Sequence, residues 1–327
     1  MIRGRVDLAL KVGLITLLTT PYVFANQDGT STATFLQIGQ GARAEGMGGA
    51  FTAVSDDAYA VYWNPAGLAQ ITRQSAAINH VEFIEKINSQ FASYVAPVNK
   101  LNGSFGVGLT YVDLGQIDKT DTTDANLGSG KVSSYAGTLS WGQAVGDRLA
   151  LGASFKFINQ NLAGETGSGL AADLGGLIAL VPDRLTLGLT ALNLGPKLKT
   201  GTSEEDLPRT LTAGLAFHAI PHKLLLAVDG AKETATDFQL RVGGEYTIQD
   251  RYIIRAGYQN LFDAGGGLSA GLGYIWRPRA DSTTDFFGQY DNKKEAQQHG
   301  VDIRIDYAYV DYGDFNATQR IGLHIAF

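Results

Sequence analysis

From about residue 74 onward, apolar and polar side chains alternate along short segments that are separated by polar turns. In residues 101–111, for example, Leu101, Phe105 and Leu109 share one parity, while Asn102 and Ser104 share the other. Alternation with a period of two is typical of β-strands, because successive side chains point to opposite faces. The pattern predicts about fourteen strands, near 74–82, 90–98, 101–112, 131–145, 148–157, 170–181, 184–192, 209–219, 223–230, 237–248, 251–258, 267–277, 301–310 and 319–327.

Charged residues avoid the apolar parity in the clearest of these segments. A cation that faces lipid at the middle of a membrane costs roughly 2–4 kcal/mol, whereas in a lumen it meets water or an opposite charge. Aromatic residues lie near the strand ends, where a membrane interface favours them: Tyr111, Tyr258, Tyr274, Trp276, Tyr307 and Tyr309. The pattern therefore predicts an all-β, transmembrane antiparallel β-barrel. A soluble β-sandwich is the alternative.

The connections between the expected strands alternate in length. Short turns such as 146–147 and 182–183 follow even-numbered strands, whereas long polar segments such as 113–130 and 158–169 follow odd-numbered ones. Short periplasmic turns and longer outer loops are typical of outer-membrane barrels, and an even strand number predicts that both termini are periplasmic. Residues 278–299 break the rule. We expect a periplasmic insertion there, or an extra hairpin around 286–290.

The two ends of the chain predict export. Residues 1–25 combine early positive charges, a short apolar run at 12–19 and the sequence Val23-Phe24-Ala25, as in a signal peptide cleaved near Ala25. The apolar run is too short to span a membrane as a helix. The last strand ends on Phe327 and resembles the terminal signal that the barrel assembly machinery reads. We therefore expect a location in the cell outer membrane, in contact with its lipid.

The segment 35–71 does not alternate. It contains a cluster of glycines, then Asp56 and Asp57 before a short helix-like run that ends at Trp63, then Asn64-Pro65-Ala66. The stretch GARAEGMGGAFTAVSDDAYAVYWNPAGLA resembles the N-terminal signature of the FadL-like outer-membrane superfamily, especially its PorV/PorQ-type branch. The resemblance covers about thirty residues.

This resemblance implies a barrel of fourteen strands (73–327) whose N-terminal segment (26–72) folds into the lumen as a hatch. It assigns Asn64, Pro65 and Ala66 to the hatch motif, and makes Asp56, Asp57 and Trp63 further candidates for a ligand or hatch role. The leading expectation is passive transport of hydrophobic small molecules such as long-chain fatty acids. The alternative is a secretion-associated protein that binds cargo or translocon components. A packing plug without a ligand role is a third possibility.

Charge and composition narrow the chemistry. The chain has 327 residues, no cysteine and a net charge of −6, so we expect neither nucleic acid nor a thiolate metal site as a partner. We expect no cofactor and no enzymatic activity, since the G-x-S-x-G match around Ser269 lies inside a strand rather than at a strand-to-helix turn. We expect the inward charges to brace the wall and hold the plug, or to line a path: Lys156, Asp173, Arg241, Glu245, Arg255, Asp302, Arg304 and Asp306.

Overall fold

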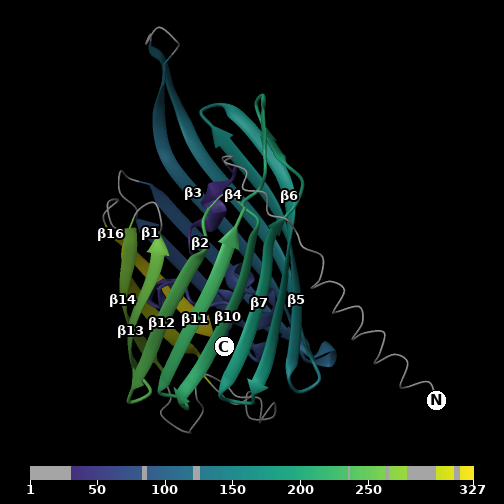
Figure 1. Cartoon of the computed structure of the whole chain (residues 1–327), viewed down its shortest axis with the longest axis vertical. Helices are drawn as coiled ribbons and strands as arrows, with labels where there is room; N and C mark the ends of the chain where they lie inside the picture. The colour runs from purple at the N-terminus through teal and green to yellow at the C-terminus, as the bar shows by residue number, and fades with distance from the viewer. Residues whose placement is uncertain are drawn as a thin grey trace, which may run out of the picture.

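The chain forms a closed antiparallel barrel of fourteen strands (Figure 1). The computed structural model describes residues 31–82, 87–120, 126–234, 236–261, 265–277, 300–312 and 317–327. Sequential strands pair with each other, and the β1–β16 pairing completes the ring. The strands of the wall are β1 (Ser75–Glu82), β2 (Asn88–Val98), β3 (Gly103–Thr120), β4 (Asn126–Val145), β5 (Leu149–Leu162), β6 (Glu165–Val181), β7 (Leu185–Leu194), β10 (Thr210–Ile220), β11 (Leu224–Glu233), β12 (Gln239–Ile248), β13 (Tyr252–Leu261), β14 (Gly265–Trp276), β15 (Asp302–Asp311) and β16 (Ala317–Ala326).

All fourteen expected strands are confirmed, but two expected outer loops are strands instead. β3 and β4 continue through most of 113–130 and form the tallest hairpin in Figure 1. β5 and β6 likewise take up most of 158–169. These extensions rise above the ring of the wall, where water bathes both faces of a hairpin, so no apolar parity marks them in the sequence. The signal peptide expected at residues 1–25 and the insertion or hairpin expected within residues 278–299 lie outside the described residues.

A small hairpin of β8 (Leu198–Thr200) and β9 (Ser203–Glu205) covers part of the outer mouth. At the opposite end, tight turns join the strands. Asp183, His222 and Asp250 adopt positive φ angles in these turns, a conformation that short hairpin loops require. The lengths of the connections therefore distinguish an outer end from a periplasmic end.

The outer surface of the wall is apolar between two aromatic belts. Leu109, Leu139 and Phe155 are among the exposed side chains of the strands. Tyr111 pairs with Tyr135 towards the outer end, and the rings of Tyr252 and Tyr274 lie 5.5 Å apart near the periplasmic turns. An apolar band bounded by aromatic residues matches the hydrocarbon layer and its two interfaces. No helix in the described part of the chain is long and apolar enough to cross a membrane.

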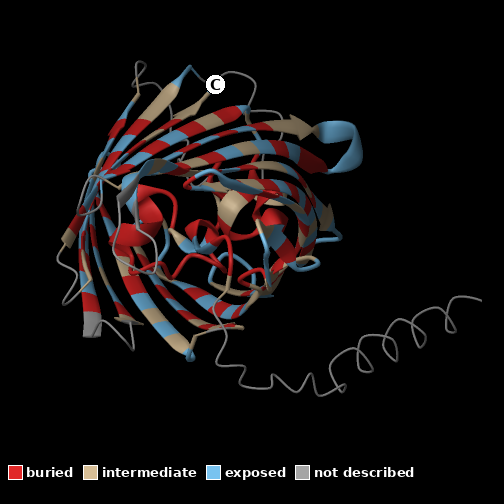
Figure 2. Ribbon diagram, turned by 90° about the horizontal axis from the view of Figure 1, so that it is seen from above, coloured by how far each residue is buried: buried red, intermediate tan, exposed pale blue. Residues whose placement is uncertain are grey.

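The N-terminal segment lies inside the barrel, where buried residues line the lumen (Figure 2). It consists of short helices joined by turns: η1 (Thr34–Gln37), α2 (Ala42–Gly46), α3 (Ala60–Trp63) and η2 (Pro65–Gln70). Helices of four to six residues are not stable alone in water. Their stability comes from packing against the wall, and Phe51, Tyr59 and Leu68 are buried there almost completely. We call residues 32–71 the hatch.

Candidate functional site

Six charged side chains form a closed ring of ion pairs between the hatch and the wall. In the hatch, Arg43 binds both oxygens of Glu245 at 2.8 and 2.9 Å and contacts Asp57 at 3.1 Å. In the wall, Arg255 contacts Glu245 at 2.6 Å and Asp306 at 2.9 Å.

Arg304 closes this ring, because it contacts Asp306 at 2.7 Å and Asp57 at 2.6 Å. We call these six residues the ion-pair ring. Its positive and negative groups alternate, so each charge lies between two opposite charges. Buried charges need such compensation, since burial removes their hydration. Asp56 adds a further contact to Arg43 from the more exposed side.

The electrostatics of Asp57 follow from the ion-pair ring. Burial alone would raise the pKa of the Asp57 carboxyl group, but Arg304 and Arg43 more than offset this and hold the pKa well below its usual range. Asp57 therefore stays ionised at neutral pH. By contrast, burial raises the pKa of the Tyr59 hydroxyl group, which donates a hydrogen bond to the carbonyl oxygen of Ile78.

Two further wall residues outside the ion-pair ring, Arg320 and Asp229, also bind the hatch. Arg320 of β16 contacts Glu45 at 3.2 Å and donates to the carbonyl oxygen of Gly39. Asp229 of β11 accepts from the backbone N–H groups of Phe51 and Thr52 at 3.0 and 2.9 Å. The wall thus holds the hatch through charged side chains on several separate strands.

The expected motif Asn64-Pro65-Ala66 forms the turn between α3 and η2. The side chain of Asn64 accepts from the N–H of Ala66 at 3.0 Å and donates to the carbonyl of Thr52 at 2.8 Å. Pro65 occupies the first turn of η2, where its missing N–H costs nothing. All three residues are buried. The motif therefore fixes the fold of the hatch.

Glycines in the wall let the hatch approach the strands closely. A methyl group on Gly152 would lie 2.2 Å from the carbonyl carbon of Pro65, and one on Gly175 would lie 2.1 Å from the Asn64 side chain. Gly243 has the same relation to Met47. The high glycine content of the chain is thus partly explained by backbone-to-backbone contact inside the lumen.

Trp63 lies in the aromatic centre of the hatch. Its indole N–H donates to the carbonyl of Gln40 at 2.7 Å, and its ring packs edge-on against Phe51 and Tyr62. These partners all belong to the hatch itself. Trp63 therefore stabilises the hatch internally.

The remaining expected inward charges lie apart from the ion-pair ring. Lys156 contacts Asp173 at 2.9 Å, and both bind Asn193. Asp302 lies at the periplasmic rim and contacts Arg73 at 2.8 Å. Arg241 hydrogen-bonds to the neighbouring Gln239. The structure thus brings six of the expected residues together at the ion-pair ring, namely Asp56, Asp57, Glu245, Arg255, Arg304 and Asp306. The other expected charges lie elsewhere around the lumen.

Sequence reasoning missed Arg43, Glu45 and Arg320. The signal was present, because Arg43 and Glu45 are the only charges in the glycine-rich stretch expected to enter the lumen, and buried charges require partners. Ser269, by contrast, lies within β14, where its hydroxyl group donates to the carbonyl of Gly46 at 3.3 Å. No cluster of metal-binding side chains occurs among the described residues.

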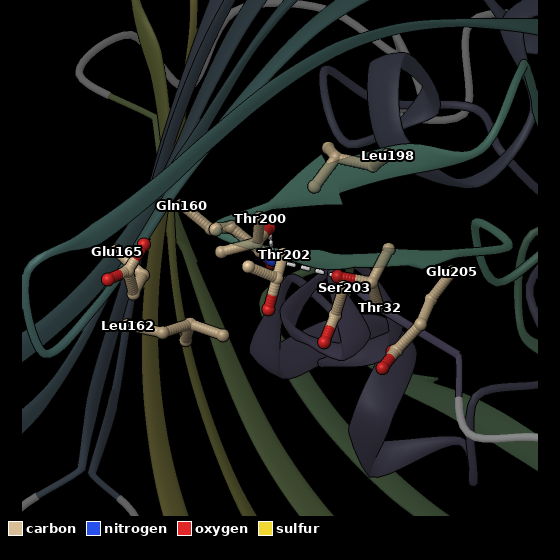
Figure 3. Close-up of a pocket in the computed structure, with 10 residues that line it drawn as sticks. Thr32, Gln160, Leu162, Glu165, Leu198, Thr200, Thr202, Ser203 and Glu205 are labelled. Atoms are coloured by element: carbon tan, nitrogen blue, oxygen red, sulfur yellow. Dashed lines mark hydrogen bonds between the residues drawn. The ribbon is translucent and has the colours of Figure 1, made fainter.

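The outer mouth contains an apolar cluster and a pocket. Phe35 and Leu36 of the hatch pack against wall and loop residues in the upper lumen, namely Val112, Ala136, Ile158, Ala171, Leu198 and Leu207. Above them, a cavity of about 350 Å³ lies between the β5–β6 hairpin and the β8–β9 hairpin (Figure 3). Thr32, Gln160 and Thr200 belong to its lining.

Comparison with solved structures shows a shared fold. The Pseudomonas putida toluene transporter TodX matches with a TM-score of 0.59 and 13% identity, over 88% of this chain and 97% of that one. The monoaromatic hydrocarbon channel CymD matches with a TM-score of 0.57 and 15% identity, over 89% and 98%. A Pseudomonas aeruginosa FadL homologue matches with a TM-score of 0.52 and 14% identity, over 86% and 96%.

No curated protein sequence matches the chain significantly. The family model of the type IX secretion system protein PorV, however, matches residues 24–228. This range contains the whole hatch, including the motif Asn64-Pro65-Ala66, and the wall from β1 to the first half of β11. The match covers more than half of the sequence, and the closed barrel with a luminal hatch agrees with the FadL-like architecture. The chain therefore belongs to the PorV family.

Proposed function

We propose that this outer-membrane barrel is a secretion-associated protein that holds exported proteins or translocon components at its outer end. The observation that carries the proposal is the filled lumen. The hatch occupies it from Thr32 at the outer mouth to Ile71 at the periplasmic rim, and the ion-pair ring holds the hatch to the wall. A filled lumen favours a role as a scaffold over a role as an open channel. The tall outer hairpins are available for contact with a partner protein. Membership of the PorV family supports this proposal.

Deleting the gene in its own host tests this proposal. We expect exported proteins to accumulate in the periplasm and to decrease in the medium, with recovery when the wild-type gene is restored. The uptake of a fluorescent long-chain fatty acid should not change. Normal secretion together with loss of fatty-acid uptake would overturn the proposal.

Passive transport of hydrophobic small molecules is the second candidate. Two observations favour it: the apolar cluster below the outer mouth, and a fold shared with proteins described as a toluene transporter and a hydrocarbon channel. It ranks second because transport would require the hatch to move against the ion-pair ring. Native mass spectrometry of the gently extracted barrel tests it. A co-purifying apolar ligand that is lost in the double variant Asn64→Ala, Pro65→Ala would support transport, and an empty lumen would count against it.

We propose no catalytic step for either candidate. The hydroxyl group of Ser269 donates to the carbonyl of Gly46 in the hatch. We further propose that the apolar exterior contacts outer-membrane lipid. The terminal strand ending at Phe327 is proposed to be recognised by the barrel assembly machinery. Export through a signal peptide at 1–25 remains a prediction.

A further inference from the structure

The two ends of the barrel hold the two ends of the described chain. At the outer mouth, the N–H of Thr32 donates to the carbonyl of Asp206 at 3.0 Å, whereas at the periplasmic rim the N–H of Phe327 donates to the carbonyl of Gln74 at 2.9 Å. The prediction that both ends of the chain are periplasmic is therefore wrong for residue 31, the first described residue. The periplasmic rim consists of short turns together with the C-terminal end.

Four turns of the periplasmic rim share the same three-residue loop. In each of them, the strand residues on either side of the loop pair directly across the hairpin, as Val145 does with Leu149. The third loop residue is always basic, and its carbonyl group accepts a backbone hydrogen bond from a neighbouring strand. The loops are residues 146–148, 182–184, 221–223 and 249–251, with Arg148, Arg184, Lys223 and Arg251 at the third position.

The basic residue of each loop lies directly beyond the apolar outer surface of the wall. A strand advances about 3.3 Å per residue, so the start of each basic side chain lies within a few residues of the hydrocarbon layer. That depth is the head-group region of a bilayer, which borders the hydrocarbon core. The exposed apolar residues that precede the four loops are Val145, Val181, Ile220 and Ile248.

Three of the four basic residues are arginines that point to a partner outside the chain. Arg148, Arg184 and Arg251 are exposed, and we call them the rim arginines. Within the described part of the chain, no ion pair or side-chain hydrogen bond joins any of them to another residue. Lys223 differs, because it lines a small pocket together with His218 and Glu245. The rim arginines are therefore available for contact with the surroundings of the barrel.

We infer that the rim arginines bind the phosphate groups of anionic phospholipids in the inner leaflet of the outer membrane. A planar guanidinium group offers pairs of N–H donors that match the oxygens of a phosphate. An anionic leaflet attracts basic side chains near its surface. The three arginines precede β5, β7 and β13, so they are spread around the barrel as the lipids of a leaflet are. The inference does not depend on the proposed secretion function.

The charges of the turns favour lipid over a soluble acidic protein as the partner. The middle residue of each of the three loops is an aspartate, and at the tip of the hairpin it lies farther from the hydrocarbon than the arginine. A soluble partner would meet these carboxylates first, whereas a lipid phosphate approaches from the side of the wall. The net charge of the whole chain is −6, so the arginines do not reflect a general excess of positive charge. The aspartates are Asp147, Asp183 and Asp250.

Native mass spectrometry tests the inference on the barrel released from lipid nanodiscs with equal amounts of phosphatidylcholine and phosphatidylglycerol. The wild type should retain several-fold more phosphatidylglycerol than phosphatidylcholine. The triple variant Arg148→Gln, Arg184→Gln, Arg251→Gln should retain the two lipids equally. The triple variant Arg148→Lys, Arg184→Lys, Arg251→Lys should keep a preference for phosphatidylglycerol, because it retains the charges. Equal retention by the wild type would overturn the inference, as would an unchanged preference in the glutamine variant.

A third triple variant provides the matched control, because it removes the same amount of positive charge from the opposite end of the barrel. The variant Lys197→Gln, Lys199→Gln, Lys232→Gln changes the outer mouth and should keep the wild-type preference for phosphatidylglycerol. If it loses the preference as the arginine-to-glutamine variant does, net charge rather than position explains the binding, and the inference fails. Heat-modifiable migration on gels verifies that each variant is a folded barrel.

Discussion

Arg43 connects the hatch to the wall through the geometry of its guanidinium group. The group is planar and carries five N–H donors, so it can bind Glu245 in a bidentate manner and still reach Asp57 and Asp56. A lysine ammonium group could not satisfy this arrangement. One residue of a short helix thus joins two parts of the hatch, α2 and the Asp56-Asp57 turn, to strand β12 of the wall.

Replacing Glu245 tests the contribution of the ion-pair ring. We expect Glu245→Gln to lower the free energy of unfolding by about 3–5 kcal/mol, because Arg43 and Arg255 lose the negative charge between them in a buried site. Thermal unfolding in detergent, followed by heat-modifiable migration, measures the effect.

The exposed pair of Lys131 and Asp113 provides the control. Asp113→Asn should cost about 0–1 kcal/mol, since solvent screens a surface ion pair. Equal losses in the Glu245 and Asp113 variants would contradict the assigned importance of the ring.

The hatch should loosen in acid because of Asp57. Its pKa in the folded protein lies below the value of about 4 in an unfolded chain, so its stabilising contribution is complete above pH 4 and is lost as the pH falls further. The groups that face it are Arg43, Arg304 and, more weakly, His324. We expect single-barrel conductance in planar bilayers to rise below about pH 4. Asp57→Asn should weaken this dependence, and an identical pH profile in that variant would reject Asp57 as its source.

At the scale of elements, the hatch packs closely against the strands at positions where the strands carry glycine. The short helices of the hatch carry too few residues to fold alone. Their backbone instead lies against glycine in the wall, and these contacts leave no room for a methyl group. The hatch is therefore folded by the barrel that surrounds it.

The substitution Gly152→Ala should prevent the hatch from packing against the wall. Its methyl group would meet the backbone of Pro65, so we expect a loss of about 1–3 kcal/mol or more in stability and a higher conductance. Gly137 on the neighbouring strand β4 is the matched control, because nothing lies within 4 Å of the position of its methyl group. Thermal unfolding and bilayer recordings of both variants decide the question. A Gly152→Ala barrel as stable and as closed as Gly137→Ala would show that the close contact is unimportant.

At the scale of the whole molecule, we expect the hatch to control whether the barrel conducts. A fourteen-stranded wall encloses a lumen wide enough for solutes. We expect a variant lacking residues 32–71 to fold as a barrel and to conduct far more than the wild type in planar bilayers. Replacing the tip of the β3–β4 hairpin by a short turn should leave the conductance unchanged. A deletion variant with wild-type conductance would mean that something other than the hatch closes the lumen.

The sequence predicts the wall better than the interior, for physical reasons. In strands that contact lipid, apolar and polar residues must alternate strictly. Strands such as 101–111 and 319–327 can therefore be predicted from a single sequence. The outer parts of β3 and β4 meet water on both faces and carry no such pattern. In the lumen, the inward charges Glu245 and Arg304 were identifiable by parity, but their partners were not. Pairing across the lumen depends on the three-dimensional path of the hatch, which lacks any period.

The contacts of Arg43 also impose an order of events on biosynthesis. The hatch leaves the ribosome before the wall, yet the strands that bind it through Glu245 and Arg304 are among the last to be made. Arg320, close to the final residue, holds Glu45 in the same way. The hatch therefore stays without these wall partners until the last strands have been made. The ion pairs between the hatch and the wall therefore form last during assembly. A barrel truncated near its C-terminus lacks the contact between Arg320 and Glu45.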